Sequence, residues 1–453
     1  MPFVRNAVLA ICMLCTWSVV ATAEAQEAPS EHVVLISIDG LRPEFYMSDD
    51  WAAPVIQQMA DEGAYAEAVR GIFPSVTYPS HATIVTGAKP AHHGIDYNTP
   101  FEPEGQSGRW YWDADSLQST SLWEAANDAG HTTASISWPT TVGAPIDYNL
   151  PQIWAIDGSG DDISLVREHE QPEGFFAELE REATGTMTND IFGLGDLTRE
   201  DRTGAMAAYT LEEHQPNFMT VHLIHTDYYQ HQEGRDGPMV RRSLAAVDRA
   251  IGQMVEAAER ADIIDETTFI ITGDHGFVDI HTSVAPNTWL VDAGLREADR
   301  NRDDWRATFH TSGASAFLHL NDPDDTAAVD EVRAALDDLP RSTRKLFRIV
   351  DRDELDEWST APDAALGLTP KPGVTFSGAA SGEAISSAQG GTHGYVPDFH
   401  NIHTGFIAWG AGVHSDAVAQ TMGMEDIAPT IEALLDLDLD APDGVLYPGL
   451  LDE

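Results

Sequence analysis

The sequence predicts an α/β fold with a central, mostly parallel β-sheet flanked by helices. Near-continuous apolar runs of strand length recur along the chain, as expected for strands buried on both faces. Segments with helical spacing lie between these runs, which is the pattern of βαβ units. Three of the runs are followed by an acid, namely Asp39, Asp227 and Asp274.

The individual elements follow from apolar pattern and from glycine or proline at their ends. Strands are predicted at 32–38, 133–138, 218–224, 267–272 and 404–409. Helices are predicted at 51–62, before Gly63, and at 80–86, before Gly87. Two further helices are predicted at 238–260 and 424–435.

Two regions interrupt this alternation. Residues 145–215 are mixed and partly helical, and residues 285–390 contain a strand pattern at 314–320 and a helix pattern at 325–339. A glycine- and serine-rich stretch, 376–391, leads to His393. No internal repeat is visible. We therefore expect residues 26–453 to form one catalytic domain in which 145–215 and 285–390 are inserted as a cap over the sheet edge.

The composition is strongly acidic. Among 453 residues there are 25 Lys and Arg against 74 Asp and Glu, a formal net charge of -49. Such a surface repels nucleic-acid backbones and anionic membranes, which argues against a polymeric nucleic-acid partner. A small phosphate ester drawn in by metal ions remains compatible with it. The acids are spread along the chain, as in an adaptation for solubility.

The N-terminus has the pattern of a secretory signal peptide over residues 1–25. Arg5 supplies the positive charge, 7–21 is apolar, and Ala23-Glu-Ala25 resembles a cleavage site before Gln26. Both cysteines, Cys12 and Cys15, fall within it, so a mature chain would have no disulfide. We expect an exported protein, periplasmic or secreted, without stable membrane insertion. The sequence does not specify an oligomeric state.

Acids and histidines recur where predicted strands end. In open α/β sheets, ligands bind at the carboxyl edge of the strands. Three carboxylates and three imidazoles can hold two divalent metal ions, and paired ions commonly serve phosphoryl transfer. The candidate ligands are Asp39, Asp227, His231, Asp274, His275 and His393.

A hydroxyl-rich turn at 73–81 offers a nucleophile. Pro79 suits the first turn of a short helix, which would place Thr77 at the helix N-terminus, where a phosphoryl group is favoured. A neighbouring metal would lower the pKa of its hydroxyl. Ser75 and Ser80 are the rival hydroxyls. We expect His81 to be a hydrogen-bonded core residue and assign no role to His222 or His225.

Taken in order, these segments resemble the alkaline phosphatase superfamily, and within it the type I nucleotide pyrophosphatase/phosphodiesterase family. The resemblance extends from about Val33 to Leu435. The matching segments are Ile38-Asp-Gly-Leu-Arg42, 73–95, the Asp227 cluster, Thr272-Gly-Asp-His-Gly276, Thr392-His-Gly-Tyr395 and 405–410. The resemblance implies an alkaline phosphatase-like fold.

The resemblance also implies a site with two Zn²⁺ ions per chain and a covalent mechanism. Asp227, His231 and His393 match the ligands of one ion. The ligands of the other match Asp39, Asp274, His275 and the nucleophile Thr77. Thr77 would attack phosphorus to form a phosphothreonine, which activated water would release. Asn98 would donate to a phosphoryl oxygen, and Tyr78, where the family usually has phenylalanine, would stack on a base or aryl group.

Some positions depart from the family pattern. Ser80 replaces a common asparagine, and Thr140-Thr141 follow Trp138-Pro139 where a Gly-Ser pair is usual. The lysine/arginine pair of some monoesterase relatives is not evident, which favours diesters. The nucleophile segment also lacks the arginine expected in sulfatases.

The sequence-based hypothesis is therefore an exported phosphodiesterase acting on nucleotide-type phosphodiesters or pyrophosphates. One alternative keeps the site but makes the protein a phosphomonoesterase, a phosphonate hydrolase or a lipid-headgroup phosphodiesterase. Others are a non-catalytic metal-binding protein and a metal-free structural protein. The native metal stays open, since Asp/His sites also accept manganese, iron or cobalt.

Overall fold

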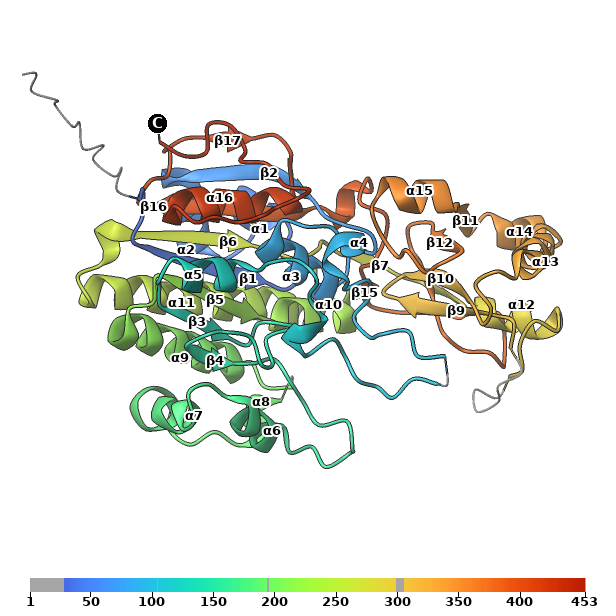
Figure 1. Cartoon of the computed structure of the whole chain (residues 1–453), viewed down its shortest axis with the longest axis horizontal. Coiled ribbons are helices and arrows are strands. Elements are labelled where there is room, and N and C mark those ends of the chain that lie inside the picture. The colour runs from blue at the N-terminus through green and yellow to red at the C-terminus, as the bar shows by residue number, and fades with distance from the viewer. Residues whose placement is uncertain (1–27, 104, 194, 299–304, 453) are drawn as a thin grey trace, which may run out of the picture.

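The chain forms a mixed α/β fold around one large sheet (Figure 1). We describe it from a computed structural model that covers residues 28–103, 105–193, 195–298 and 305–452. The predicted signal peptide, with Cys12 and Cys15, lies outside these residues. Among the described helices, none combines the length and the apolar character needed to cross a membrane.

The central sheet has nine strands in the order β17-β2-β16-β6-β1-β5-β3-β4, and β18 also pairs with β2. Strands β1, β5, β6, β3 and β4 run parallel, whereas β16 is antiparallel to both β6 and β2. The bounds are β1 His32–Ile38, β2 Ala64–Arg70, β3 Thr133–Ile136, β4 Tyr148–Leu150, β5 Phe218–Leu223, β6 Thr267–Thr272, β16 Thr404–Gly410, β17 Val418–Ala419 and β18 Met422–Gly423.

Helices cover both faces of this sheet, which explains why every residue of β1, β5 and β6 is buried. One face packs against α2 (Pro54–Glu62), α9 (Thr198–His214) and α11 (Pro238–Arg260). The other packs against α3 (Thr77–Thr86), α5 (Leu122–Asp128) and α16 (Ile427–Leu435) (Figure 1). The fold class is therefore the one that the sequence predicts.

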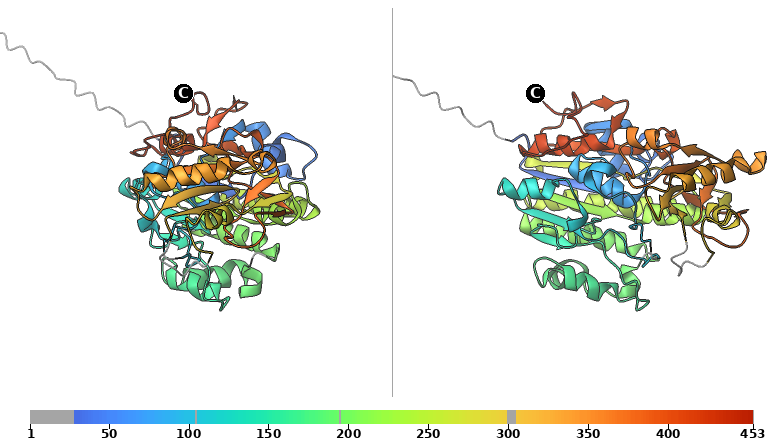
Figure 2. Two further views of the ribbon diagram at one scale, coloured as in Figure 1. Left: turned by 90° about the vertical axis from the view of Figure 1, so that its right-hand side faces the viewer. Right: turned by 45° about the vertical axis from the view of Figure 1, so that its right-hand side comes forward.

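A second sheet lies beside the central one, at the right of Figure 1 (see also Figure 2). Its antiparallel strands follow the order β11-β12-β10-β9. The bounds are β9 Ala307–Ser312, β10 Ser315–Leu320, β11 Phe347–Val350 and β12 Leu366–Pro370. Helices α12 (Pro286–Asp292), α13 (Thr326–Asp337), α14 (Arg341–Arg344) and α15 (Arg352–Glu357) accompany it. Part of this sheet shares a buried cluster with Phe73, whose ring lies 5.2 Å from that of Phe317.

The remaining elements are short. Helices α6 (Asp162–His169), α7 (Phe175–Leu179) and α8 (Asn189–Phe192) lie in the partly helical region at the bottom of Figure 1. Helices α1 (Glu44–Met47) and α4 (Pro90–His93) lie in connections, and α10 (His225–Glu233) follows β5. Two small sheets pair β13 (Val374–Phe376), β8 (Thr282–Val284) and β14 (Ile385–Ser387), and β15 (Gly391–Thr392) with β7 (Val278–Asp279).

Candidate active site and metal centre

The carboxyl ends of three neighbouring strands bring the predicted acids together. Asp39 follows β1 directly, Asp274 lies just beyond β6, and Asp227 lies in the first turn of α10, after β5. Since β1 lies between β5 and β6 and runs parallel to both, these ends meet at one edge. His231 is one turn after Asp227 on the same helix face.

Gly40 fixes the turn after Asp39. Its φ is +71°, and a Cβ there would lie 2.8 Å from Nε2 of Gln230. Its backbone N–H donates to Oδ1 of Asp274 at 2.9 Å. Glycine is the residue that accepts this backbone geometry, and the hydrogen bond leaves Oδ2 of Asp274 to face the site.

One cluster consists of Asp227, His231 and His393. Oδ1 of Asp227 lies 3.3 Å from Nε2 of His231 and 3.5 Å from Nε2 of His393. Each imidazole donates its Nδ1–H to a backbone carbonyl, His231 to Gly391 at 2.9 Å and His393 to Ser75 at 3.0 Å. This arrangement presents the Nε2 lone pairs and is the usual one for metal-binding histidines.

A second cluster consists of Asp39, Asp274 and His275, all of them buried. Nε2 of His275 lies 3.4 Å from Oδ1 of Asp39 and 3.2 Å from Oδ2 of Asp274. The Nδ1–H of His275 donates to the Gly276 carbonyl at 3.2 Å. The two clusters adjoin, because the rings of His275 and His393 stack with centroids 3.5 Å apart.

Four of these ligand atoms are buried without a hydrogen-bond partner among the described residues. They are Oδ1 of Asp39, Oδ1 of Asp227, Oδ2 of Asp274 and Nε2 of His275. Leaving one such atom unsatisfied costs about 1–3 kcal/mol. Divalent cations would satisfy all four, and carboxylate and imidazole donors are the types that such cations bind. The residues present therefore fit a pair of metal ions.

The acids also repel one another. Burial and the neighbouring charge of Asp274 raise the pKa of Asp39 well above its usual value. Burial raises the pKa of Asp274 too, but His275 and other histidines outweigh it and hold that pKa well below its usual value. The pKa of Asp227 is also lowered, because the nearby histidines, His231 above all, outweigh the effect of burial. Cations between these carboxylates would relieve the repulsion.

Thr77 is the first residue of α3 and lines a cavity of about 750 Å³ together with Asp39, Asp227 and His231. Its hydroxyl makes no hydrogen bond with the described residues, and 8% of the residue is exposed. The rival Ser75 donates instead to the Tyr395 carbonyl at 3.1 Å, and Ser80 is fully buried. Of the three candidate hydroxyls, only that of Thr77 belongs to a residue lining this cavity.

Asn98 lies in a loop beside the start of α3. Its Oδ1 accepts a hydrogen bond from the Tyr78 N–H at 2.9 Å, one of the N–H groups that the first turn of a helix leaves free. That bond orients the side-chain amide, so its NH₂ group is available to donate to another acceptor.

Aromatic side chains form much of the cavity wall. The Tyr78 ring packs edge to face on Trp110 at 5.2 Å, and Trp110 packs likewise on Trp154 at 5.0 Å. Tyr228 and Phe192 also line the cavity. Such walls can hold a planar aromatic group by stacking and edge contacts.

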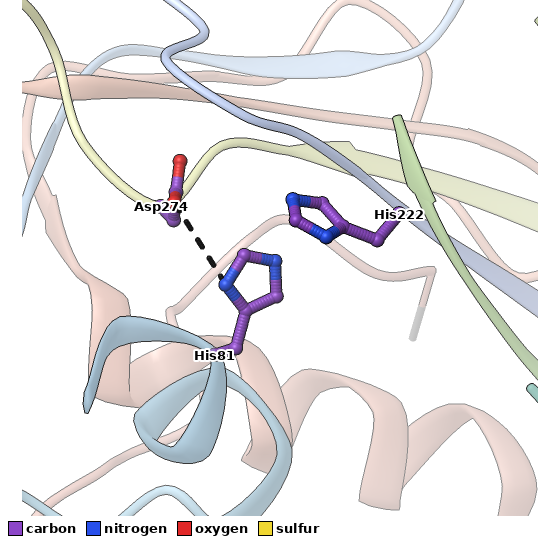
Figure 3. Close-up of side chains that lie close together, drawn as sticks. All are labelled: His81, His222 and Asp274. Atoms are coloured by element: carbon purple, nitrogen blue, oxygen red, sulfur yellow. Dashed lines mark ion pairs between the residues drawn. The ribbon is translucent and has the colours of Figure 1, made fainter. Parts of the chain in front are cut away.

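His81, expected from the sequence to be a core residue, and His222, without an expected role, lie close to the candidate ligand Asp274 (Figure 3). His81 donates from Nδ1 to the Thr77 carbonyl at 2.8 Å, as expected for a core histidine, and that nitrogen lies 3.8 Å from Oδ2 of Asp274. Nε2 of His222 lies 3.2 Å from Oδ2 of Asp39. Burial lowers the pKa of His81 to about 4 and that of His222 well below its usual value. Both rings are therefore neutral at neutral pH.

Glu200 is a buried acid that the sequence did not single out. Its Oε1 accepts from the backbone N–H groups of Ile224 at 2.9 Å and His225 at 2.7 Å, and from Nδ1 of His225 at 2.6 Å. It thereby satisfies free N–H groups at the start of α10. No motif links Glu200 to Asp227, so only the fold reveals this support.

Known proteins resemble this chain over most of its length. A family model described as type I phosphodiesterase / nucleotide pyrophosphatase matches residues 33–396. Mouse ectonucleotide pyrophosphatase/phosphodiesterase family member 3 is 24% identical over 400 residues, 83% of this chain and 39% of that protein. The bis(5'-adenosyl)-triphosphatase enpp4 of Xenopus laevis is 22% identical over 424 residues, covering 91% of this chain and 80% of that protein.

Solved structures share the fold. Human ectonucleotide pyrophosphatase/phosphodiesterase 5 superposes with a TM-score of 0.66 at 20% identity, over 93% of this chain and all of that one. An inactive murine form in complex with AMP gives 0.64 at 19% identity, over 90% of this chain and 96% of that one.

The extent of the match differs among the curated relatives. The chain spans 25% of the length of mouse family member 1 and 39% of member 3. The family model nevertheless covers most of this chain. That family is metal-dependent, and the two Asp/His clusters described above could hold metal. The chain belongs to the type I phosphodiesterase/nucleotide pyrophosphatase family, within the alkaline phosphatase superfamily.

Proposed function

We propose that this protein is a two-zinc phosphodiesterase that hydrolyses nucleotide-type phosphodiesters or pyrophosphates through a covalent intermediate on Thr77. One observation carries the proposal. Thr77, at a helix N-terminus, lines a cavity with members of two Asp/His clusters in which four buried donor atoms lack protein partners. Asp227, His231 and His393 would hold one ion, and Asp39, Asp274, His275 and Thr77 the other.

Bound ions would supply charge stabilisation and lower the pKa of the attacking hydroxyl. Oγ1 of Thr77 attacks phosphorus, the bond to the leaving group breaks, and the leaving oxygen takes up a proton. The resulting threonine ester is cleaved when a water oxygen attacks phosphorus and the threonine oxygen departs. The free N–H groups of the first turn of α3 favour the anionic phosphoryl group throughout.

Asn98 acts on the same phosphoryl group. Its Oδ1 is engaged by the Tyr78 N–H, so the side-chain NH₂ group donates to a non-bridging oxygen as charge develops there. A preorganised donor of this kind stabilises the transition state more than the ground state. Tyr78 contributes a wall for the base or aryl group.

The cavity favours a diester over a small monoester. The cavity has a volume of about 750 Å³ and an aromatic wall that includes Tyr78, Trp110 and Trp154. A phosphomonoester with a small substituent would leave most of these contacts unused. A nucleoside or aryl group would fill it.

The domain organisation and export belong to the same proposal. We infer that residues 26–453 act as one catalytic domain in which 145–215 and 285–390 cap the site, and that residues 1–25 direct export. The cavity lining supports the first cap, because it includes Trp154, Asp162 and Phe192. N-terminal sequencing of the exported protein should begin near Gln26, and retention of Met1 would contradict the inference.

Hydrolysis of bis-p-nitrophenyl phosphate beside p-nitrophenyl phosphate tests the reaction class. The wild type should prefer the diester, lose activity after chelation and regain it with Zn²⁺. Thr77→Ala should abolish turnover while the protein still binds Zn²⁺ through the Asp and His side chains, and Thr77→Ser should retain part of the turnover. Preference for the monoester would assign the protein to a phosphatase function, and no turnover despite bound zinc would refute a general phosphodiesterase.

A further inference from the structure

Arg199 places a positive charge in the wall of the cavity that contains Thr77 and Asp227. It lies in the first turn of α9, and its side chain is half-buried. Nη1 donates to the Phe192 carbonyl at 2.6 Å, and the guanidinium lies over the Phe192 ring, 4.6 Å from its centroid. These contacts fix the group in place and leave its other N–H groups to donate elsewhere.

Unlike several other arginines of this acidic chain, Arg199 forms no ion pair with a carboxylate among the described residues. Arg167, Arg249 and Arg306, for example, pair with acids at 2.5, 3.0 and 2.8 Å.

The acids near Arg199 are engaged elsewhere. Glu200 binds the start of α10, and Oδ1 of Asp162, which also lines the cavity, accepts from the Ala155 N–H at 2.8 Å. The charges of both acids still act on Arg199, but neither acid forms an ion pair with it, so its remaining N–H groups can bind a ligand in the cavity.

The cavity wall therefore combines two chemically distinct parts. Tyr78, Trp110, Trp154 and Tyr228 provide aromatic surface, and Arg199 provides a fixed cation. A planar guanidinium matches phosphate oxygens through paired hydrogen bonds. A cation at this place also disfavours a positively charged substrate group, such as the quaternary ammonium of a choline ester, which aromatic walls alone would accept.

We propose that Arg199 is a specificity-determining residue that binds a second phosphate, beyond the phosphoryl group attacked by Thr77. The cavity then selects nucleoside substrates with a polyphosphate chain over those with a single phosphodiester. This inference rests on the proposed function, since the attacked phosphoryl group defines which phosphate is the second one.

The kinetic test compares two substrates with the same nucleoside, thymidine 5'-triphosphate and the p-nitrophenyl ester of thymidine 5'-monophosphate. Charged hydrogen bonds contribute about 1.5–3 kcal/mol, so Arg199→Gln should lower the ratio of their kcat/KM values roughly 10- to 100-fold. Arg199→Lys keeps the charge but loses the paired hydrogen-bond geometry. Its ratio of kcat/KM values should lie between those of the wild type and Arg199→Gln. An unchanged ratio in Arg199→Gln would overturn the proposal.

The matched control is Arg202→Gln, on the same helix. Arg202 donates to the Thr184 carbonyl at 2.5 Å and does not line the cavity. This variant should keep the wild-type ratio. An equal drop in Arg202→Gln would assign the effect to the net charge of the protein and refute a specific role for Arg199.

A binding arm separates this inference from the proposed reaction. Zinc-loaded Thr77→Ala protein is titrated with thymidine triphosphate and monophosphate, with and without Arg199→Gln. The added substitution should weaken triphosphate binding at least ~10-fold more than monophosphate binding. If triphosphate binding weakens in this way but the wild-type protein shows no turnover, only the proposed reaction is refuted. Equal weakening of both ligands, or triphosphate binding no tighter than monophosphate binding, would refute the role of Arg199.

Discussion

At the scale of single residues, the candidate ligands are oriented from behind by backbone atoms. His231, His275 and His393 each donate from Nδ1 to a different carbonyl, so all three present Nε2 to the site. Asp274 is oriented by the Gly40 N–H in the same way. These four side chains are therefore oriented by backbone groups from several separate segments of the chain.

Asp96, near Asn98, carries a pH-dependent stability term. Its Oδ1 accepts from the Ala361 N–H at 3.1 Å, and burial raises its pKa from 3.8 to about 7. Because the folded state holds this proton more tightly than the unfolded chain, the stabilisation is present below about pH 4 and is lost as pH rises to about 7. Asp96→Asn should therefore raise the free energy of unfolding at pH 8 by up to ~4 kcal/mol.

Urea unfolding at pH 4 and pH 8 measures this effect. At pH 4 the variant and the wild type should differ little, because both carry a neutral group at this position. The exposed Asp115→Asn serves as a control and should change neither value. A larger gain at pH 4 than at pH 8 would contradict the assignment.

At the scale of elements, α10 depends on a residue from α9. Glu200 accepts hydrogen bonds from the N–H groups of Ile224 and His225 at the start of α10, just before Asp227 of the candidate metal cluster. Glu200→Ala should cost about 1–3 kcal/mol of stability, because it leaves buried donors unsatisfied. It should also weaken metal binding. Calorimetric unfolding and zinc titration measure the two effects.

Glu200→Gln is the matched variant, since an amide oxygen can still accept from the backbone. It should lose less stability than Glu200→Ala. Equal zinc affinity in all three proteins would show that α10 does not need this support.

The hairpin of β9 and β10 anchors the Asn98 loop from the other side. Nε2 of His319 lies 3.1 Å from the Tyr97 hydroxyl, and His310 donates to the Thr99 carbonyl at 3.2 Å. Burial lowers the pKa of His319 to about 3, so its ring is neutral. Its Nε2 can therefore accept a hydrogen bond from the Tyr97 hydroxyl. His319→Phe should lower kcat roughly 2- to 10-fold, as expected for one neutral hydrogen bond.

Steady-state kinetics with metal analysis tests this prediction. Metal content should stay at the wild-type level, and Tyr97→Phe should give the same loss as His319→Phe. The exposed His281→Phe should have no effect. Loss of metal in His319→Phe would mean that the hairpin supports the whole site.

The sequence predicted the buried parallel strands well, because β1, β5 and β6 are continuous apolar runs. It gave no indication that 404–409 would run antiparallel, since strand direction depends on the connection and not on the local pattern. It also missed β2, where alanines at 64, 66 and 68 alternate with Tyr65, Glu67 and Val69 and the apolar run is broken. Helix α9 was missed as an element because its region appeared only partly helical.

For the candidate site, the sequence pattern identified the acids and histidines that lie where strands end. The structure brings the predicted ligands into two clusters and places Thr77 and Asn98 beside them. Other residues at or near the site left no pattern in the sequence. Glu200, His222 and Arg199 come from segments without a motif, and only tertiary packing brings them to the site.

At the scale of the whole molecule, the net charge of -49 makes the folded state repel itself. Screening should reduce this repulsion, so Tm should rise by several degrees as NaCl increases from low millimolar to about 1 M. Calorimetry of the zinc-loaded protein at increasing NaCl concentrations measures this change in Tm. Sucrose of matched osmolality separates screening from solvent exclusion, and a Tm that is flat or falls in NaCl would contradict the expectation.

Thr77 is proposed to carry the covalent intermediate in a two-metal site. The most direct measurement is rapid acid quenching of zinc-loaded enzyme with the p-nitrophenyl ester of thymidine 5'-monophosphate, followed by peptide mass spectrometry. The account predicts a thymidylyl group on Thr77, absent without zinc and absent in Thr77→Ala. A thymidylyl group on Ser75 or Ser80, or turnover by Thr77→Ala at the wild-type rate, would contradict it.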